Sequence, residues 1–329
     1  MQRAVATQSP DAGYEFALTD ADFEAFRELI LQRSGISLAA TKRSLLCGRL
    51  ARRLRHFGFS TFTQYYQYVT RQDRSGSELR ELINRITTNK TEFFRENHHF
   101  EFLTREVLTP LRTQAANGGP RRLRIWSAGC STGEEPYSIA ITIAEALPLD
   151  GWDVRILASD IDTEVLQHAA AGEYPTSSLE RVPAALRKRW FTSAATHSRQ
   201  FRIHPELRKL VSFRQINFIS EPWPIQSQFD VIFCRNVTIY FNRDVQRRLY
   251  ERFARLLRPD GFLVAGHSEN LHWLSHLFTP QGSTVYRVVG TRAAATQTPK
   301  AQAVVGARTN PSAGPPPGAK SPPSVEPDA

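Results

Sequence analysis

Residues 123–141 read LRIWSAGCSTGEEPYSIAI, and no other stretch of the chain indicates the fold as strongly. In Leu123 to Trp126, β-branched and aromatic side chains lead into small ones, which predicts a short buried strand. The small residues that follow, among them Gly129 and Gly133, allow a tight turn that can come close to a ligand. Residues 134–136, Glu-Glu-Pro, are typical of the first turn of a helix, where acids meet the positive end of the dipole. The stretch therefore predicts a strand, a glycine turn and a helix.

The next apolar run, residues 154–159, ends in Asp160. An acid after the second strand of a doubly wound fold typically accepts hydrogen bonds from a ribose diol. The turn lacks the G-x-G-x-x-G pattern of dinucleotide-binding proteins, and Glu134 and Glu135 would repel a pyrophosphate. Carboxylates suit a ligand with an amine and a sulfonium, and S-adenosylmethionine carries both together with a ribose. For this segment alone, an ordinary strand-to-helix turn with acidic capping residues stays open as the alternative.

The composition limits the classes of protein to consider. With 329 residues the chain has room for two domains and a tail. A net charge of +10 favours an acidic partner, which charge alone leaves open between nucleic acid, a membrane surface and an acidic protein. Cys47, Cys130 and Cys234 form no spaced pair, which argues against a zinc ribbon or a disulfide framework. No apolar run approaches the ~20 residues of a membrane span and the N-terminus lacks a signal-peptide core, so we expect a cytoplasmic protein without membrane insertion.

The first part of the chain has helical periodicity. Residues 1–13 are small and polar, and we expect them to be disordered; apolar residues then recur at helical spacing up to Ile86. We expect a helical domain over residues 14–74, ended by the polar link 72–77. A helix over Thr41–Phe57 has an apolar stripe on one side, and no acid occurs between residues 41 and 59. Its other side carries a basic face: Arg49, Arg52 and Arg55.

From residue 77 to 290 the chain alternates strand and helix patterns, as a parallel α/β sheet requires. Residues 193–208 interrupt the alternation, so we interpret them as an inserted subdomain. Beyond residue 291 the chain is rich in Ala and Pro with almost no large apolar residues, which predicts a disordered tail over 291–329.

Five segments in this order resemble the CheR-type chemotaxis receptor methyltransferases, and the resemblance covers about residues 23–287. They are NKTEFFR at 89–95, SAGCSTGEEPY at 127–137, ASDID at 158–162, FDVIFCRNVTIYF at 229–241 and LRPDGFLVAGHSE at 257–269. The resemblance implies a Rossmann-like α/β domain for S-adenosylmethionine-dependent methyl transfer, with a small inserted β-subdomain and an all-α N-terminal domain before it. It also implies the activity: transfer of a methyl group to glutamate side chains of chemoreceptor helices, giving glutamyl methyl esters and S-adenosylhomocysteine.

The resemblance also implies the residues that hold S-adenosylmethionine. They are Asn89, Thr91 and Arg95 on one side, Glu134 at the methionine portion, Asp160 at the ribose, Asn217 and Phe218 at the adenine, and Asn236 and Val237. The match does not fully decide which of Glu134 and Glu135 lies at the methionine portion, and we favour Glu134 because it is nearer the turn.

Methylation of a carboxylate makes modest chemical demands. A free glutamate has a pKa near ~4.3, so the nucleophile is already ionised at neutral pH and no general base is needed. Catalysis then rests on alignment and on removal of water. We predict that Arg95 and Tyr240 position the carboxylate. Two alternatives stay open. Arg95 could form a structural ion pair with Glu92 or Glu96, and Tyr240 could be a core aromatic.

Several histidines invite other interpretations that we do not favour. His98 and His99 lack acids or cysteines spaced as metal ligands, so we predict no metal. Adjacent residues such as His267, Ser268 and Glu269 do not meet in triad geometry, so we interpret these three as structural.

The expected partner is the cytoplasmic helical bundle of a chemoreceptor, docked on the basic helix Thr41–Phe57 and on the inserted β-subdomain. We expect a monomer. Two alternatives have different chemistry. A nucleic-acid methyltransferase would fit the charge, but the segment at Asn236 lacks the N/D-P-P-Y/F string of base-amine methylation and no RNA-binding module is found. A non-catalytic S-adenosylmethionine-binding sensor or scaffold is the second alternative.

Overall fold

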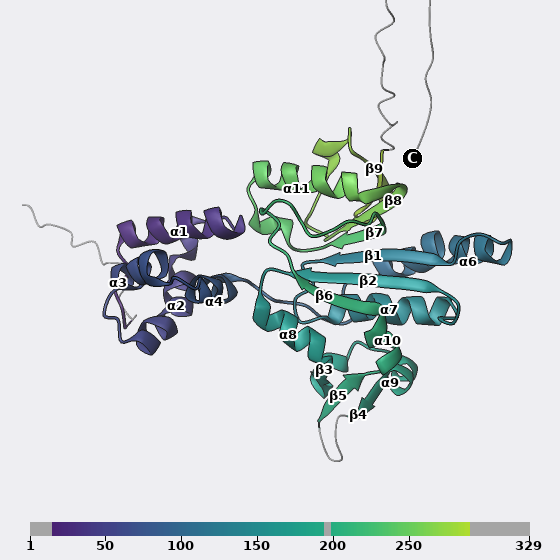
Figure 1. Cartoon of the computed structure of the whole chain (residues 1–329), viewed down its shortest axis with the longest axis horizontal. Helices are drawn as coiled ribbons and strands as arrows, with labels where there is room; N and C mark the ends of the chain where they lie inside the picture. The colour runs from purple at the N-terminus through teal and green to yellow at the C-terminus, as the bar shows by residue number, and fades with distance from the viewer. Residues whose placement is uncertain (1–14, 194–198, 290–329) are drawn as a thin grey trace, which may run out of the picture. The chain divides into compact units, whose positions relative to one another are not determined.

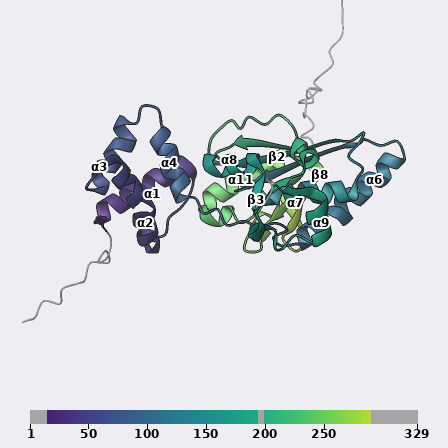
Figure 2. The same ribbon diagram turned by 90° about the horizontal axis from the view of Figure 1, so that it is seen from below.

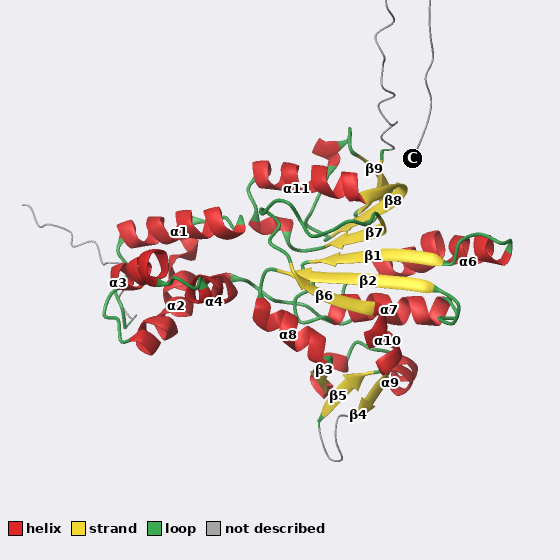
Figure 3. Ribbon diagram, viewed as in Figure 1, coloured by secondary structure: helices red, strands yellow, loops and turns green. Residues whose placement is uncertain are grey.

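The computed structural model describes residues 15–193 and 199–289. The predicted disordered segments 1–13 and 291–329, and part of the predicted insertion, lie outside these residues. The helices are α1 (Asp20–Ser34), α2 (Arg43–Phe57), α3 (Phe62–Gln67), α4 (Ser77–Ile86), α5 (His98–Phe102), α6 (Thr109–Ala116), α7 (Glu134–Ala146), α8 (Thr163–Ala171), α9 (Ala184–Trp190), α10 (Pro205–Leu210) and α11 (Arg243–Leu256). The strands are β1 (Arg122–Ala128), β2 (Asp153–Asp160), β3 (Glu173–Pro175), β4 (Phe191–Ser193), β5 (Gln200–Ile203), β6 (Val211–Gln215), β7 (Phe229–Cys234), β8 (Leu257–Ala265), β9 (Phe278–Gly282) and β10 (Val285–Val288). Figure 3 distinguishes the two kinds of element by colour.

Local sequence explains where several of these helices begin and end. The Thr19 side chain accepts a hydrogen bond from the amide of Asp22 at 3.0 Å, and the Asp22 carboxylate binds back to Thr19, which forms a capping box before α1. The Asp162 side chain caps α8 by accepting hydrogen bonds from the amides of Glu164 and Val165, and Gly172 in a left-handed conformation ends the helix, as the sequence predicts.

The main sheet has seven strands in the order β6-β2-β1-β7-β8-β10-β9 (Figure 1). The first five are parallel, and β10 runs antiparallel to both β8 and β9. Numbered within this sheet, the parallel strands follow the order 3-2-1-4-5 of doubly wound nucleotide-binding folds. The register pairs Ser127 of β1 with Ala158 of β2 and Phe233 of β7. The carboxyl ends of these three strands therefore lie at the same edge of the sheet, where such folds bind ligands.

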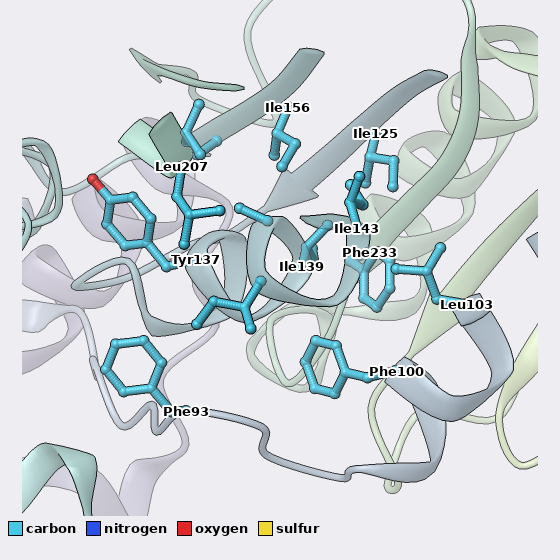
Figure 4. Close-up of a cluster of buried hydrophobic side chains, with 14 of the residues drawn as sticks. Phe93, Phe100, Leu103, Ile125, Tyr137, Ile139, Ile143, Ile156, Leu207 and Phe233 are labelled. Carbon is cyan, nitrogen blue, oxygen red and sulfur yellow. The ribbon is translucent and has the colours of Figure 1, made fainter. Parts of the chain in front are cut away.

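The side chains of β1 alternate between two hydrophobic cores on opposite faces of the sheet. Leu123 and Ile125 belong to the core that contains α7, whereas Trp126 and Ala128 belong to the core that contains α11. Figure 4 shows Ile139 and Ile143 of α7 within the first of these cores, and Figure 2 shows the sheet from below. The two cores fix β1 from both sides and so fix the turn that follows it.

The helices α1 to α4 share a third core. Leu82, Ile83 and Ile86 of α4 pack in it with Phe26 of α1 and Tyr65 of α3. The helical domain therefore extends to Ile86 and does not end near residue 74, because the polar segment 72–77 is a turn within the domain.

The inserted β-subdomain is larger than the predicted 193–208. Its sheet has the order β3-β5-β4, so it begins at Glu173, directly after α8. Its strands have only three or four residues, which is too short for an alternating pattern to be recognised in the sequence.

No helix among the described residues has the length and apolar character needed to cross a membrane.

Candidate active site

A cavity of about 540 Å³ opens at the carboxyl ends of β1, β2 and β7. The loop after α1, including Ile36 and Leu38, forms part of its wall. Of the predicted site residues, eight line it: Asn89, Thr91, Arg95, Asp160, Phe218, Asn236, Val237 and Tyr240. The two that do not are Glu134 and Asn217.

The turn after β1 is compact because of its glycines. Gly129 has a φ of +90°, and a Cβ there would lie 2.3 Å from Cγ2 of Val237. The amides of Gly129 and Cys130 donate to the carbonyl of Ser159 at 2.8 and 2.9 Å, which ties the turn to β2. No larger residue fits at Gly129 without displacing Val237, so the turn brings its bare backbone against the cavity.

Asp160 is buried at the end of β2 and lines the cavity. Its Oδ2 accepts a hydrogen bond from the amide of Ser131 at 2.9 Å, and its Oδ1 accepts one from the amide of Asp162 at 3.0 Å. Burial raises the pKa of this carboxyl, partly offset by those two bonds. Each oxygen has a further lone pair, so the group can still accept hydrogen bonds from a ligand.

The acid of α7 that lines the cavity is Glu135, whereas the prediction favoured Glu134. Successive residues of a helix point about 100° apart, so only one of two neighbours faces a given wall. Glu134 turns back and accepts a hydrogen bond from the Thr132 hydroxyl at 2.6 Å. Glu135 accepts one from the Ser127 hydroxyl at 2.7 Å and lies 3.4 Å from the guanidinium of Arg235. Burial raises the pKa of both carboxyls.

Asn217, which the resemblance places at the adenine, does not line the cavity, and its side chain forms hydrogen bonds to neighbouring backbone. Its amide donates to the carbonyl of Arg33 at 2.6 Å, and its Oδ1 accepts from the amide of Ile219 at 3.1 Å. Asn217 thus links the segment after β6 to the end of α1. Phe218, the next residue, lines the cavity and packs edge-on against Trp126.

Arg95 lies between two residues with left-handed backbone, Phe94 at φ 54° and Glu96 at φ 55°. Such conformations are costly for residues other than glycine and are found at functional sites. Its guanidinium donates to the carbonyl of Lys90 at 2.9 Å. Within the described part of the chain no carboxylate forms an ion pair with it, because Glu92 pairs with Arg181 and Glu96 with Arg235. The predicted alternative of a structural ion pair for Arg95 is therefore not formed.

Tyr240 ends the 3-10 turn Thr238–Tyr240 and is partly exposed, so it is not a core aromatic. Its carbonyl accepts a hydrogen bond from the amide of Ser37 at 2.8 Å, and Ile36 forms an antiparallel bridge with Phe241. The loop after α1 therefore holds the backbone of this turn. The neighbouring Ile239 is 47% exposed at the cavity wall.

Sequence reasoning did not identify Arg235, which is buried and lines the cavity. Its Nη2 donates to the carbonyl of Arg95 at 2.5 Å and lies 3.5 Å from the carboxylate of Glu96. With the Glu135 contact, the guanidinium connects the three segments that carry Arg95, Glu135 and Asn236. The available signal was a charged residue at the end of the apolar strand 229–234.

Arg49 of the basic helix does not point freely to solvent. It donates to the carbonyls of Ile86 and Thr87 at 2.5 and 2.8 Å, so it caps the end of α4. Arg52 and Arg55 are exposed, and Arg55 lies 3.4 Å from Glu15. Arg49 thus belongs to the structure of the helical domain, while its two neighbours on the basic face are accessible.

Glu96, His98 and His99 bring ligand atoms within 4.8 Å of one another. The buried His99 places Nε2 2.9 Å from the carbonyl of Ser283, and burial lowers its pKa to about 3. The guanidinium of Arg235 lies 3.5 Å from the same Glu96 oxygen that faces His99. A fixed positive charge there competes with a cation for that oxygen.

Comparison with known proteins agrees with this architecture. Residues 21–87 match the family described as "CheR methyltransferase, all-alpha domain", and residues 89–287 match "CheR methyltransferase, SAM binding domain". The chain is 47% identical to chemotaxis protein methyltransferase 2 of Pseudomonas aeruginosa, over 85% of this chain and 98% of that protein. It is 42% identical to the chemotaxis protein methyltransferase of Escherichia coli, over 82% of this chain and 91% of that protein.

Proposed function

The chain belongs to the CheR methyltransferase family, and from that premise we propose that it methylates glutamate side chains on the cytoplasmic helices of chemoreceptors. It is an S-adenosylmethionine-dependent methyltransferase whose relatives are chemotaxis protein methyltransferases. The products of the proposed reaction are glutamyl methyl esters and S-adenosylhomocysteine, and the proposed role is sensory adaptation.

The observation that carries the proposal is the set of groups around the cavity. Asp160 is a buried carboxylate and the Glu135 side chain is only 13% exposed, and two such carboxylates suit a ligand with an ammonium, a sulfonium and a ribose diol. Gly129 leaves room for close approach of the backbone, and Phe218 offers an apolar face for the adenine. These residues fit S-adenosylmethionine, and we assign them to hold it together with Asn89, Thr91, Asn236 and Val237.

When bound, S-adenosylmethionine supplies a methyl group on a positively charged sulfur. The receptor glutamate is already ionised at neutral pH, so no residue of the chain has to remove a proton. Arg95, which has no described carboxylate partner, attracts and orients the incoming carboxylate. The Tyr240 hydroxyl donates a hydrogen bond to one of its oxygens. The walls of the cavity exclude water from the weak nucleophile, so alignment supplies most of the acceleration.

We assign the docking of the receptor to the accessible part of the basic helix. Arg52 and Arg55 line a shallow depression that shares Arg49 and Asn89 with the cavity. Opposite charge on a glutamate-rich receptor helix would steer it to this face and place one glutamate at the mouth. The inserted β-subdomain is a second proposed contact with the receptor.

A substitution on this face tests the docking. Arg52→Ala removes an exposed side chain with no partner among the described residues, so we expect unchanged thermal stability. The KM for a receptor fragment should rise about 3-fold at low salt and converge with the wild-type value at high salt. Arg74→Ala, an exposed arginine after the helical turn at residues 68–72, is the matched control. Equal KM values for both variants and the wild type would remove Arg52 from the docking surface.

The reaction itself is tested with methyl-labelled S-adenosylmethionine, the purified full chain and a receptor cytoplasmic fragment. Glutamyl methyl esters release volatile methanol in alkali, whereas methylated bases do not. We expect alkali-labile label on the fragment that is lost with Arg95→Ala and with Asp160→Ala. Cofactor binding without volatile label on any receptor fragment would favour a non-catalytic sensor, and alkali-stable label on added RNA would favour nucleic-acid methylation.

A further inference from the structure

Glu269 lies in the turn after β8 and is only 4% exposed. It comes from the segment His267-Ser268-Glu269, which the sequence analysis interpreted as structural. Its carboxylate faces the segment Asn236–Tyr240 that follows β7, about thirty residues earlier in the chain.

The carboxylate accepts hydrogen bonds from three successive backbone amides of that segment. Oε2 accepts from Asn236 at 2.8 Å, and Oε1 accepts from Val237 at 3.0 Å and from Thr238 at 2.7 Å. Oε1 also accepts from the Thr238 hydroxyl at 2.7 Å, and Oε2 from the Gly266 amide at 2.6 Å. These five donors fill all of the roughly four lone-pair sites of the carboxylate, and each bond to a charged acceptor is stronger than a neutral one.

The segment cannot hold this shape by local interactions alone. Asn236 has a left-handed backbone with φ 59°, and the three amides point to one spot, where each needs an acceptor because the site is largely buried. The absence of a side chain at Gly266 lets the two segments come close together. A Cβ at residue 266 would lie 2.5 Å from Nδ2 and 2.7 Å from N of Asn236. Gly266 and Glu269, which both follow β8, therefore complement the shape and the hydrogen-bond donors of the segment after β7.

A short relay extends the contact to α11. Because the Thr238 hydroxyl donates its proton to Glu269, it accepts from the Tyr250 hydroxyl, 2.8 Å away. Burial holds the pKa of Tyr250 well above its usual range, so that hydroxyl keeps its proton.

The segment carries three of the residues assigned to the reaction. Val237 closes over Gly129 of the glycine turn, Asn236 lines the cavity, and Tyr240 is held on the opposite side by Ser37. We propose that Glu269 is a positioning residue for methyl transfer, which acts by fixing the backbone of 236–240 and so the placement of Val237 and Tyr240. This proposal rests on the proposed function.

Glu269→Gln tests it, because glutamine keeps the shape but offers one acceptor oxygen and an amide that faces the backbone donors. We expect kcat for methyl ester formation to fall ~100-fold with the KM for the receptor fragment nearly unchanged, as misplacement of reacting groups does. Hydrogen exchange of the amides in 235–241 should accelerate, while exchange in β1 and α7 stays at the wild-type rate. Glu145→Gln is the matched control, since Glu145 lies at the C-terminal end of α7 and accepts a hydrogen bond from the Trp190 indole at 2.7 Å.

A folded Glu269→Gln protein with kcat within ~3-fold of the wild type would overturn the proposal. So would faster exchange throughout the domain, since that would mark a general structural role. If the Glu269→Gln variant does not fold, Thr238→Val tests the proposal instead, because it removes the hydroxyl donor to Glu269. A ~10-fold loss of kcat at unchanged melting temperature supports the proposal. An unchanged kcat rejects it. The exchange measurement needs no receptor, so a wild-type protein without methyl transfer would reject the proposed function and leave the Glu269 test intact.

Discussion

Two neighbouring segments, the turn 128–135 after β1 and the segment 235–241 after β7, form parts of the cavity wall, and they reach their shapes in different ways. The turn 128–135 owes its shape mainly to its own glycines, which adopt left-handed backbone, and its amides add hydrogen bonds to the neighbouring strand β2. The segment 235–241 depends on distant residues, because Glu269 holds its amides and Ser37 holds the carbonyl of Tyr240. The turn 128–135 could therefore be recognised from its local sequence. The shape of the segment 235–241 is seen only in the tertiary structure.

The two segments touch where Val237 packs on Gly129, so Gly129→Ala should have the largest effect. A Cβ there would lie 2.3 Å from Val237, and the φ of +90° is unfavourable for alanine. We expect a loss of roughly 3 kcal/mol of unfolding free energy and a cofactor affinity at least ~100-fold weaker. Thermal melting and calorimetric titration with S-adenosylhomocysteine measure the two effects.

Gly58→Ala is its control, since Gly58 also has a positive φ of +69° but nothing lies within 4 Å of its Cβ position. It should lose only about 1 kcal/mol and keep full affinity. Equal effects of the two substitutions would show that the contact between the segments contributes nothing.

Asp160→Asn tests the first segment alone. The amide keeps the size of the side chain but loses the charge and half of the acceptors, so cofactor affinity should fall about 10- to 100-fold. Burial raises the pKa of Asp160, which means that the buried charge costs stability at neutral pH. Removal of that cost offsets the hydrogen bond that the asparagine amide cannot accept from one of the two backbone N–H groups, so the melting temperature should change little.

Asp153→Asn, at the exposed start of the same strand, provides the comparison for Asp160→Asn. It should leave cofactor affinity unchanged. An Asp160→Asn variant that binds S-adenosylhomocysteine as tightly as the wild type would exclude Asp160 from the cofactor site.

The smallest effect concerns His99, which lies beside the Glu96–Arg235 pair that supports the second segment. Its pKa is lowered to about 3 by burial and by the charge of Arg235, against ~6.5 in an unfolded chain. Below pH 6.5 the unfolded state therefore binds the extra proton, and stability should be lost by at most ~1.4 kcal/mol per pH unit as the pH falls toward 3.

Denaturant unfolding of His99→Gln between pH 7 and pH 5 should give a flatter profile than that of the wild type. Glu96 and His98 also face this group and remain in the variant. His276 is exposed, so His276→Gln should keep the wild-type dependence of stability on pH. If His99→Gln also kept the wild-type dependence, His99 would not be a buried neutral histidine.

The sequence predicted the parts of the molecule that local chemistry determines. The strand of Leu123 to Trp126, its glycine turn, Asp160 at the end of β2 and the α8 boundary at Gly172 all lie where the patterns placed them. These features rest on residues close together in the chain, where propensity and capping act.

The errors concern packing between distant segments. Periodicity identified α4, but only its core contacts assign it to the helical domain. The choice between Glu134 and Glu135 depends on the angle at which α7 leaves the turn. The sequence pattern places Arg49 on a solvent-exposed basic face, whereas in the structure its guanidinium donates to the carbonyls of Ile86 and Thr87. Glu269 gave no local signal, because its partners lie about thirty residues away.

The central claim is that the cofactor binds between these two segments. Hydrogen exchange of the full chain with and without S-adenosylhomocysteine tests it directly. The account predicts that bound S-adenosylhomocysteine slows exchange in 127–137, in 158–162 and in 235–241 together. Slower exchange confined to a separate depression, lined by Arg33, Asn217 and Trp223, with those three segments unchanged, would contradict it.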